Sequence, residues 1–174
     1  MMGVVEQAYE IVDPQYVVPA VTIMARIAEL DGSGAEATSL LDRLRSTWIA
    51  GRAPDPATEL VRALVAADQA DAIPMVMADL EEGPPRVEHM HVAVSAIYAE
   101  CDGRLAEAER LYDEASVRWR RFEWPYELAH ALAGLARCSG DGAPQAAAEA
   151  AAIFLRLGVV PDAQRLRKGD RTHP

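Results

Sequence analysis

The stretch VTIMARIAELDGSGAEATSLLDRLRSTW, residues 21–48, decides the fold, because it returns without a gap as VAVSAIYAECDGRLAEAERLYDEASVRW at residues 92–119. Twelve of the 28 aligned positions are identical, at an offset of 71 residues. Such a self-match indicates a repeated structural unit. A further unit follows, since Gly134 occupies the position equivalent to Ala96, 38 residues later. The sequence therefore predicts a chain built from repeats.

Each unit is predicted to be a pair of helices joined by a glycine turn. The turns are Asp31-Gly32-Ser33-Gly34 and Cys101-Asp102-Gly103-Arg104, in which glycine supplies the left-handed conformation that ends a helix. Small residues recur twelve positions apart and would let the two helices of a unit touch closely, because a larger side chain would hold them apart. These pairs are Ala25 with Ala37, Ala96 with Ala108, and Gly134 with Ala146.

Composition and charge exclude several classes of protein. The chain has 174 residues, of which 51% are hydrophobic and 25% charged, as in a folded and soluble protein. A formal net charge of −10 repels phosphate backbones, so this segment is predicted not to contact nucleic acid directly. No apolar run is long enough to span a membrane, and the N-terminus does not resemble a signal peptide. We therefore expect a cytoplasmic protein.

Units of this kind resemble tetratricopeptide repeats, whose period of about 34 residues is close to half of the self-match offset. The resemblance implies an all-α, right-handed superhelix of helix-turn-helix repeats. We expect one repeat domain over residues 1–164, with units at about 16–50, 54–83, 86–123 and 125–160, preceded by a partial unit at 4–12. The second unit is degenerate, with helices expected at 57–67 and 73–80, and Pro84-Pro85 is interpreted as a bend in a continuous stack. Residues 165–174 are predicted to be a linker towards a missing C-terminal domain.

A second resemblance concerns the parent protein. Residues 112–167 include the segments WRRF at 119–122, PYELA at 125–129 and AGLARC at 133–138. They are similar to the helical region of large actinobacterial LuxR-type ATP-binding transcriptional regulators, some of which are fused to adenylate or guanylate cyclase domains. The resemblance implies that this chain is the middle of such a regulator and couples a nucleotide-binding module to a helix-turn-helix DNA-binding domain. ATPase or cyclase modules would then lie outside this chain.

No catalytic, cofactor-binding or metal-binding residues are predicted. The Gly32-Ser33-Gly34 run lacks the lysine of a phosphate-binding loop. His89 and His91 lie two apart and would point about 200° apart on a helix, so we interpret them as a helix start with one solvated histidine. The pairs Glu81/Glu82 and Glu107/Glu109 stand beside arginines on solvated faces, so acid–base catalysis is not expected of them.

Packing roles are predicted for the remaining conspicuous side chains. Cys101 and Cys138 end helices in equivalent places of neighbouring units, and we interpret them as small core residues in a reducing compartment. Trp48 and Trp119 occupy equivalent positions and are expected to pack between units. The loop cluster Trp124-Pro125-Tyr126 is also expected to pack.

The predicted interaction surface lies on the first helices of the units, which line the concave face of such superhelices. By this register the candidate partner contacts are Met90, Ala93, Ile97, Leu128, Ala131 and Leu135. The expected partner is a protein or peptide, or a neighbouring domain of the same parent chain, and the uncapped ends are expected to self-associate. The alternative is a stand-alone tetratricopeptide-like adaptor that binds a peptide or partner protein. An enzyme with an unrecognised site is the third alternative.

Overall fold

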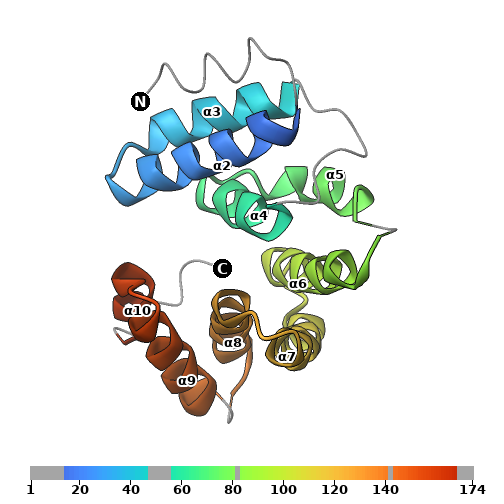
Figure 1. The fold of residues 1–174 in the computed structure, drawn as a ribbon, viewed down its shortest axis with the longest axis vertical. Helices are drawn as coiled ribbons and strands as arrows, with labels where there is room; N and C mark the ends of the chain where they lie inside the picture. The colour runs from blue at the N-terminus through green and yellow to red at the C-terminus, as the bar shows by residue number, and fades with distance from the viewer. Residues whose placement is uncertain (1–13, 47–55, 81–82, 141–142, 168–174) are drawn as a thin grey trace. The chain divides into compact units, whose positions relative to one another are not determined.

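The chain is all-helical over the residues that the structure, a computed structural model, describes: 14–46, 56–80, 83–140 and 143–167. These ranges hold nine α-helices, labelled α2 to α10, and a 3₁₀ helix, η1, without a strand (Figure 1). The all-α prediction is therefore confirmed. The elements run α2 Pro14–Leu30, α3 Gly34–Ser46, α4 Ala57–Ala66, η1 Ala70–Ala72, α5 Ile73–Ala78, α6 Pro85–Cys101, α7 Leu105–Arg121, α8 Pro125–Cys138, α9 Ala143–Arg156 and α10 Val160–Arg167.

The chain divides into two compact units, residues 1–88 and 89–174. The division falls inside the first turn of α6, shortly after Pro84-Pro85. The first unit contains α2 to α5, and the second contains most of α6 together with α7 to α10. This division does not decide whether the two units belong to one repeat domain, so the single domain over residues 1–164 stays a prediction.

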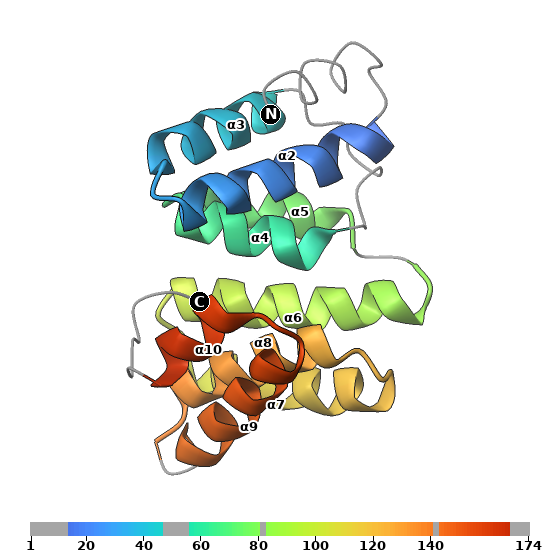
Figure 2. The same cartoon turned by 60° about the vertical axis from the view of Figure 1, so that its left-hand side comes forward.

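The first unit is organised around the helix pair α2 and α3, with α4 packed against α2 (Figure 2). The predicted close contact is confirmed, since Ala25 on α2 and Ala37 on α3 are both buried. Gly32 ends α2 with φ +87°, and the backbone N–H of Ser33 donates to the carbonyl of Ala28 over 2.7 Å. This is the left-handed helix end that the sequence predicts.

The degenerate region of the first unit forms its expected helices with small differences. The helix expected at 57–67 is α4, and the helix expected at 73–80 is α5, which ends at Ala78 and is preceded by η1. The side-chain amide of Gln69 donates to Asp42 Oδ1 over 2.9 Å, which ties the segment before η1 to α3. Ile73 and Val76 are fully buried and anchor α5.

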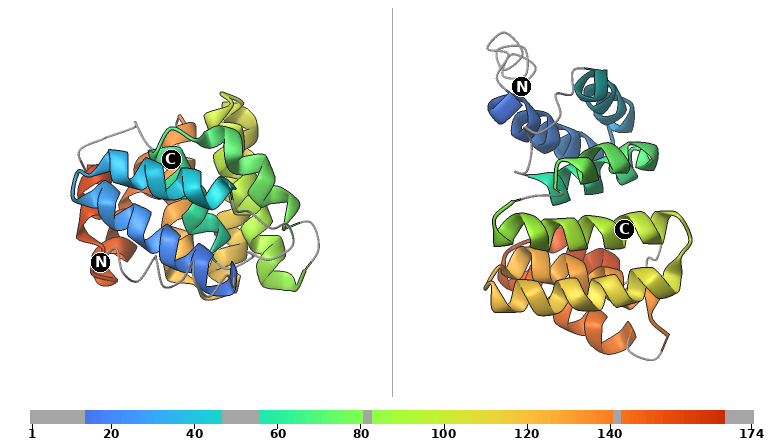
Figure 3. Two further views of the ribbon diagram at one scale, coloured as in Figure 1. Left: turned by 90° about the horizontal axis from the view of Figure 1, so that it is seen from above. Right: turned by 90° about the vertical axis from the view of Figure 1, so that its right-hand side faces the viewer.

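The second unit packs its helices in chain order, α7 against α8, α8 against α9, and α9 against α10 (Figure 3). Ala96 and Ala108 are completely buried, and Gly134 and Ala146 are buried as well, whereas a direct contact within each pair stays a prediction. The side of Gly134 that would carry a Cβ lies against the Tyr112 ring of α7. Gly103 adopts φ +73° in the turn between α6 and α7. This turn therefore has the same geometry as the one at Gly32.

The C-terminal helix α10 extends beyond the predicted start of the linker at residue 165. Residues 165–167 were expected to begin a linker, yet they are the last turn of α10. The reason is that Ala163 is completely buried and α10 packs against α9, so helical structure continues past residue 160. The remainder of the predicted linker, residues 168–174, and the partial unit at 4–12 lie outside the described residues.

Candidate interaction surface

Five of the six predicted partner contacts are buried in the interior. Met90, Ala93 and Ile97 project from α6 and are buried, and Leu128 and Ala131 on α8 are buried too. Leu135 is half-buried. These side chains therefore contribute to packing in this structure, and their contact with a partner stays a prediction.

A largely buried polar cluster ties α6, α7 and α8 of the second unit together. Glu100 lies in the last turn of α6, Tyr112 on α7, and Arg137 in the last turn of α8. Arg137 donates from Nε to Glu100 Oε1 over 2.6 Å and from Nη2 to Oε2 over 2.9 Å. The Tyr112 hydroxyl donates to the same Oε2 over 2.5 Å. One carboxylate therefore links α6, α7 and α8.

The protonation states around this cluster are fixed at neutral pH. Burial raises the pKa of Tyr112 well above its usual value, and the neighbouring Glu100 carboxylate raises it further although Arg137 lowers it. Burial and Glu100 likewise raise the pKa of Cys138 to about 11. A phenol and a thiol held in their neutral forms are poor bases and poor nucleophiles. We therefore interpret the cluster as a structural link between helices.

The two cysteines end α6 and α8 as predicted, but the prediction that they are core residues is wrong. Cys101 is exposed and Cys138 is half-buried. The physical reason is their position, because the last residue of a helix lies at the end of the packed stack, where fewer side chains cover it.

Aromatic side chains form a second cluster around the end of α7. Trp119 is completely buried, and its ring lies 5.4 Å from that of His89 and 5.7 Å from that of Trp124. Trp119 therefore packs in the interior as expected, its role between repeat units stays a prediction, and Trp48 lies outside the described residues. Phe122 stacks on Trp124 with ring centroids 5.9 Å apart, so the loop cluster also packs as expected. His89 and His91 were interpreted as a helix start with one solvated histidine, yet both side chains are half-buried. His89 packs against Trp119 and Phe122 at the end of α7.

Charged groups also join α2 and α4 in the first unit. Glu59 on α4 accepts from Arg26 of α2 over 2.9 Å and from Arg62 over 2.8 Å. Burial alone would raise the pKa of Glu59, but the attraction of Arg62 and Arg26 outweighs it and lowers that pKa. The carboxylate is therefore held in its charged form, which suits a structural ion pair better than a proton-transfer group.

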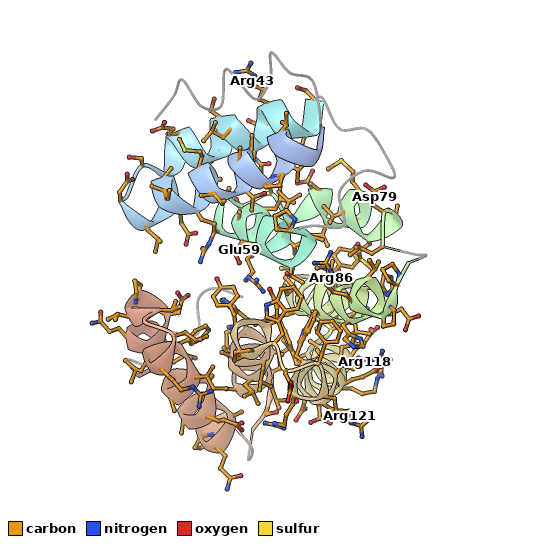
Figure 4. The ribbon with its side chains drawn as sticks, in the orientation of Figure 1. Arg43, Glu59, Asp79, Arg86, Arg118 and Arg121 are labelled. Atoms are coloured by element: carbon orange, nitrogen blue, oxygen red, sulfur yellow. The ribbon has the colours of Figure 1, made fainter. Side chains whose placement is uncertain are left out.

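An open hollow of 620 Å³ lies on α7, and the sequence analysis did not identify it. Six of its lining residues come from one stripe of α7 and one comes from α6: Arg110, Asp113, Glu114, Val117, Arg118, Arg121 and His89. Glu114 accepts from Arg118 Nη2 over 2.8 Å and from Arg110 Nη1 over 3.4 Å. Figure 4 labels Arg118 and Arg121 on this helix. The spacing of three and four residues along α7 was the available sequence signal.

Neither metal ligation nor membrane insertion is indicated by the described part of the chain. Within it, no three His, Cys, Asp or Glu side chains gather as a metal site requires. None of the described helices combines the length and apolar character needed to cross a membrane.

In the comparisons with known proteins, no family model, curated protein or solved structure matched this sequence.

Proposed function

We propose that the chain is a non-enzymatic helical-repeat module that mediates interaction and relays conformational state between neighbouring domains. The observation that carries the proposal is that several positions identical in the self-match also share their burial or their turn geometry. Ala25 and Ala96 are both buried, and Gly32 and Gly103 both end a helix in the left-handed conformation. Equivalent helix pairs stacked in register would form the tetratricopeptide-like, right-handed superhelix, an architecture that serves as a binding scaffold.

The parent protein in this proposal is a multidomain cytoplasmic transcriptional regulator. The similarity of residues 112–167 to LuxR-type ATP-binding regulators supports this assignment, and these residues cover α9, most of α7 and the whole of α8. In such a protein the chain would lie between a nucleotide-binding module and a helix-turn-helix domain. The buried links at Glu100 and Glu59 would make each group of helices stiff enough to transmit a displacement.

The test uses the parent reading frame and its products. We expect a nucleotide-binding module and a helix-turn-helix domain encoded on the two sides of this chain, and binding of the chain to at least one of them in isothermal titration calorimetry. The chain alone should neither hydrolyse ATP nor shift a DNA fragment in an electrophoretic assay. A reading frame without either module, together with ATP hydrolysis by the chain itself, would overturn the proposal.

A stand-alone adaptor that binds a peptide is the second candidate. The specific observation that favours it is the hollow on α7, whose lining combines exposed arginines with an exposed apolar side chain at Val117. The two candidates differ in the reading frame, because only the adaptor would be encoded without the flanking modules.

A further inference from the structure

We propose that the hollow on α7 binds an acidic peptide segment in an extended conformation. This inference rests on the proposed function as an interaction module, and it adds where the partner binds and what chemistry it has. Three features of the protein point to this ligand: the uneven pairing of the arginines in the hollow, the distance between those arginines, and the charge of the rest of the chain.

The arginines of the hollow are not equally engaged. Arg118 donates from both Nε and Nη2 to Glu114, at 3.0 and 2.8 Å, so its guanidinium is held within the protein. Arg110 reaches the same glutamate by one longer contact of 3.4 Å, and its side chain is 65% exposed. Arg121 is exposed and makes no ion pair with any of the described residues. Arg110 and Arg121 are therefore the two guanidinium groups available to a partner.

The spacing of these two arginines defines the partner. They lie eleven residues apart on α7, which is about 16 Å along a helix axis. An extended peptide covers this distance in about five residues. Val117 lies between the two arginines in the sequence and is 39% exposed, so it offers an apolar contact in the middle of the hollow. A matching segment has five residues, with acidic side chains at the first and fifth positions and an apolar side chain at the third, because alternate side chains share one face of an extended chain.

The charges favour separate carboxylates over a polyphosphate. Asp113 and Glu114 also line the hollow, so a densely charged phosphate backbone would meet repulsion between the arginines. Two spaced carboxylates can face the arginines and avoid both acids. The chain as a whole carries a net charge of −10, so an acidic peptide is repelled by most of its surface, and the arginine pair gives this site its selectivity.

Fluorescence anisotropy with a fluorescein-labelled peptide of sequence Glu-Ser-Leu-Ser-Glu tests the inference. The full chain should bind this peptide, and binding should weaken as salt is added, because exposed charge pairs are screened. A peptide with glutamine in place of both glutamates should bind much more weakly. The double variant Arg110→Gln, Arg121→Gln should lose about tenfold in affinity, the sum of two exposed charge pairs.

The matched control is Arg156→Gln, which removes an exposed arginine of α9 outside the hollow and should leave the affinity unchanged. Circular dichroism shows whether each variant keeps its helices. The inference is overturned by equal affinity of the double variant and the wild type, by equal binding of the glutamine peptide, by absence of binding, or by tighter binding of an RNA oligonucleotide. If the chain still binds the modules of its parent in calorimetry, that failure leaves the proposed function standing.

Discussion

Gly134 shows at the scale of a single residue how one helix makes room for another. A Cβ built at this position would lie 2.6 Å from Tyr112 Cδ1 and closer still to Cε1 and Cζ. The tyrosine cannot easily move away, because its ring is buried and its hydroxyl is bonded to Glu100. The ring of α7 therefore occupies the space that a side chain on α8 would need.

We predict that Gly134→Ala lowers the free energy of unfolding by about 1–3 kcal/mol, because overpacking a fixed contact outweighs the better helix propensity of alanine. Urea denaturation followed by circular dichroism measures the change. The matched control is Gly140→Ala, because a Cβ at Gly140 meets nothing within 4 Å, and its effect should stay within about 0.5 kcal/mol. A Gly134→Ala variant as stable as the wild type would show that α7 and α8 can separate without cost.

At the scale of elements, buried ion pairs connect helices that are distant in sequence. Arg137 and Glu100 are 37 residues apart, and each side chain is only 12% exposed. Arg26 and Glu59 join α2 to α4 in a comparable way. Pairs of this kind are costly to break one partner at a time, because the remaining charge is left in a poorly hydrated place.

Removing the carboxylate of the first pair should destabilise the second unit. We predict that Glu100→Gln costs about 3 kcal/mol of unfolding free energy, because the buried Arg137 guanidinium loses its counter-charge and Tyr112 loses a charged acceptor. Glu149→Gln is the control, since its pair with Arg120 is about half exposed and should contribute less than about 1 kcal/mol. Similar losses in both variants, measured by chemical denaturation, would contradict the structural role of the Glu100 link.

The Arg26–Glu59 pair should make the stability of the first unit depend on pH. The pKa of Glu59 is lowered in the folded chain from its ordinary 4.5, so its stabilising effect is fully present above about pH 4.5 and is lost as pH falls through the folded value. We predict that the difference in unfolding free energy between wild type and Glu59→Gln is largest near neutral pH and shrinks below about pH 4.5. Denaturation curves across this pH range measure it. A difference independent of pH would contradict the assignment.

At the scale of the whole molecule, the chain consists of two compact units, residues 1–88 and 89–174. The Glu100 cluster and the aromatic cluster of Trp119 both lie in the second unit. The start of α6, just before this unit, is closed by the Pro84 carbonyl, which accepts from the Val87 N–H over 2.8 Å. The second unit therefore contains the contacts that a folded domain requires.

We predict that a fragment of residues 84–174 folds by itself. It should show a helical circular dichroism spectrum, a cooperative urea transition, and the blue-shifted fluorescence of a buried tryptophan, because Trp119 is fully covered. The variant Glu100→Gln in the same fragment should lower the midpoint of the transition. A broad transition with solvent-exposed tryptophan fluorescence would show that the second unit depends on residues 1–83.

The features that the sequence predicted correctly are local ones. The glycine turns at Gly32 and Gly103 depend on a few neighbouring residues, and the small residues at Ala25/Ala37 and Ala96/Ala108 depend on one helix pair. Helical periodicity and turn chemistry encode both directly. For this reason the helices, the turns between them and the burial of the small residues followed from the sequence.

The tertiary structure alone decided which surfaces are covered. Cys101 is exposed because it ends its helix, where few side chains cover it. His89 packs against Trp119, which lies thirty residues away in the sequence. Helix α10 extends the helical region to Arg167 because it packs against α9. The arginines of the hollow are spaced on α7 in a pattern that the sequence displays. Whether a helix face is open or buried depends on the next helix, and periodicity reports only the character of a face, not what lies against it.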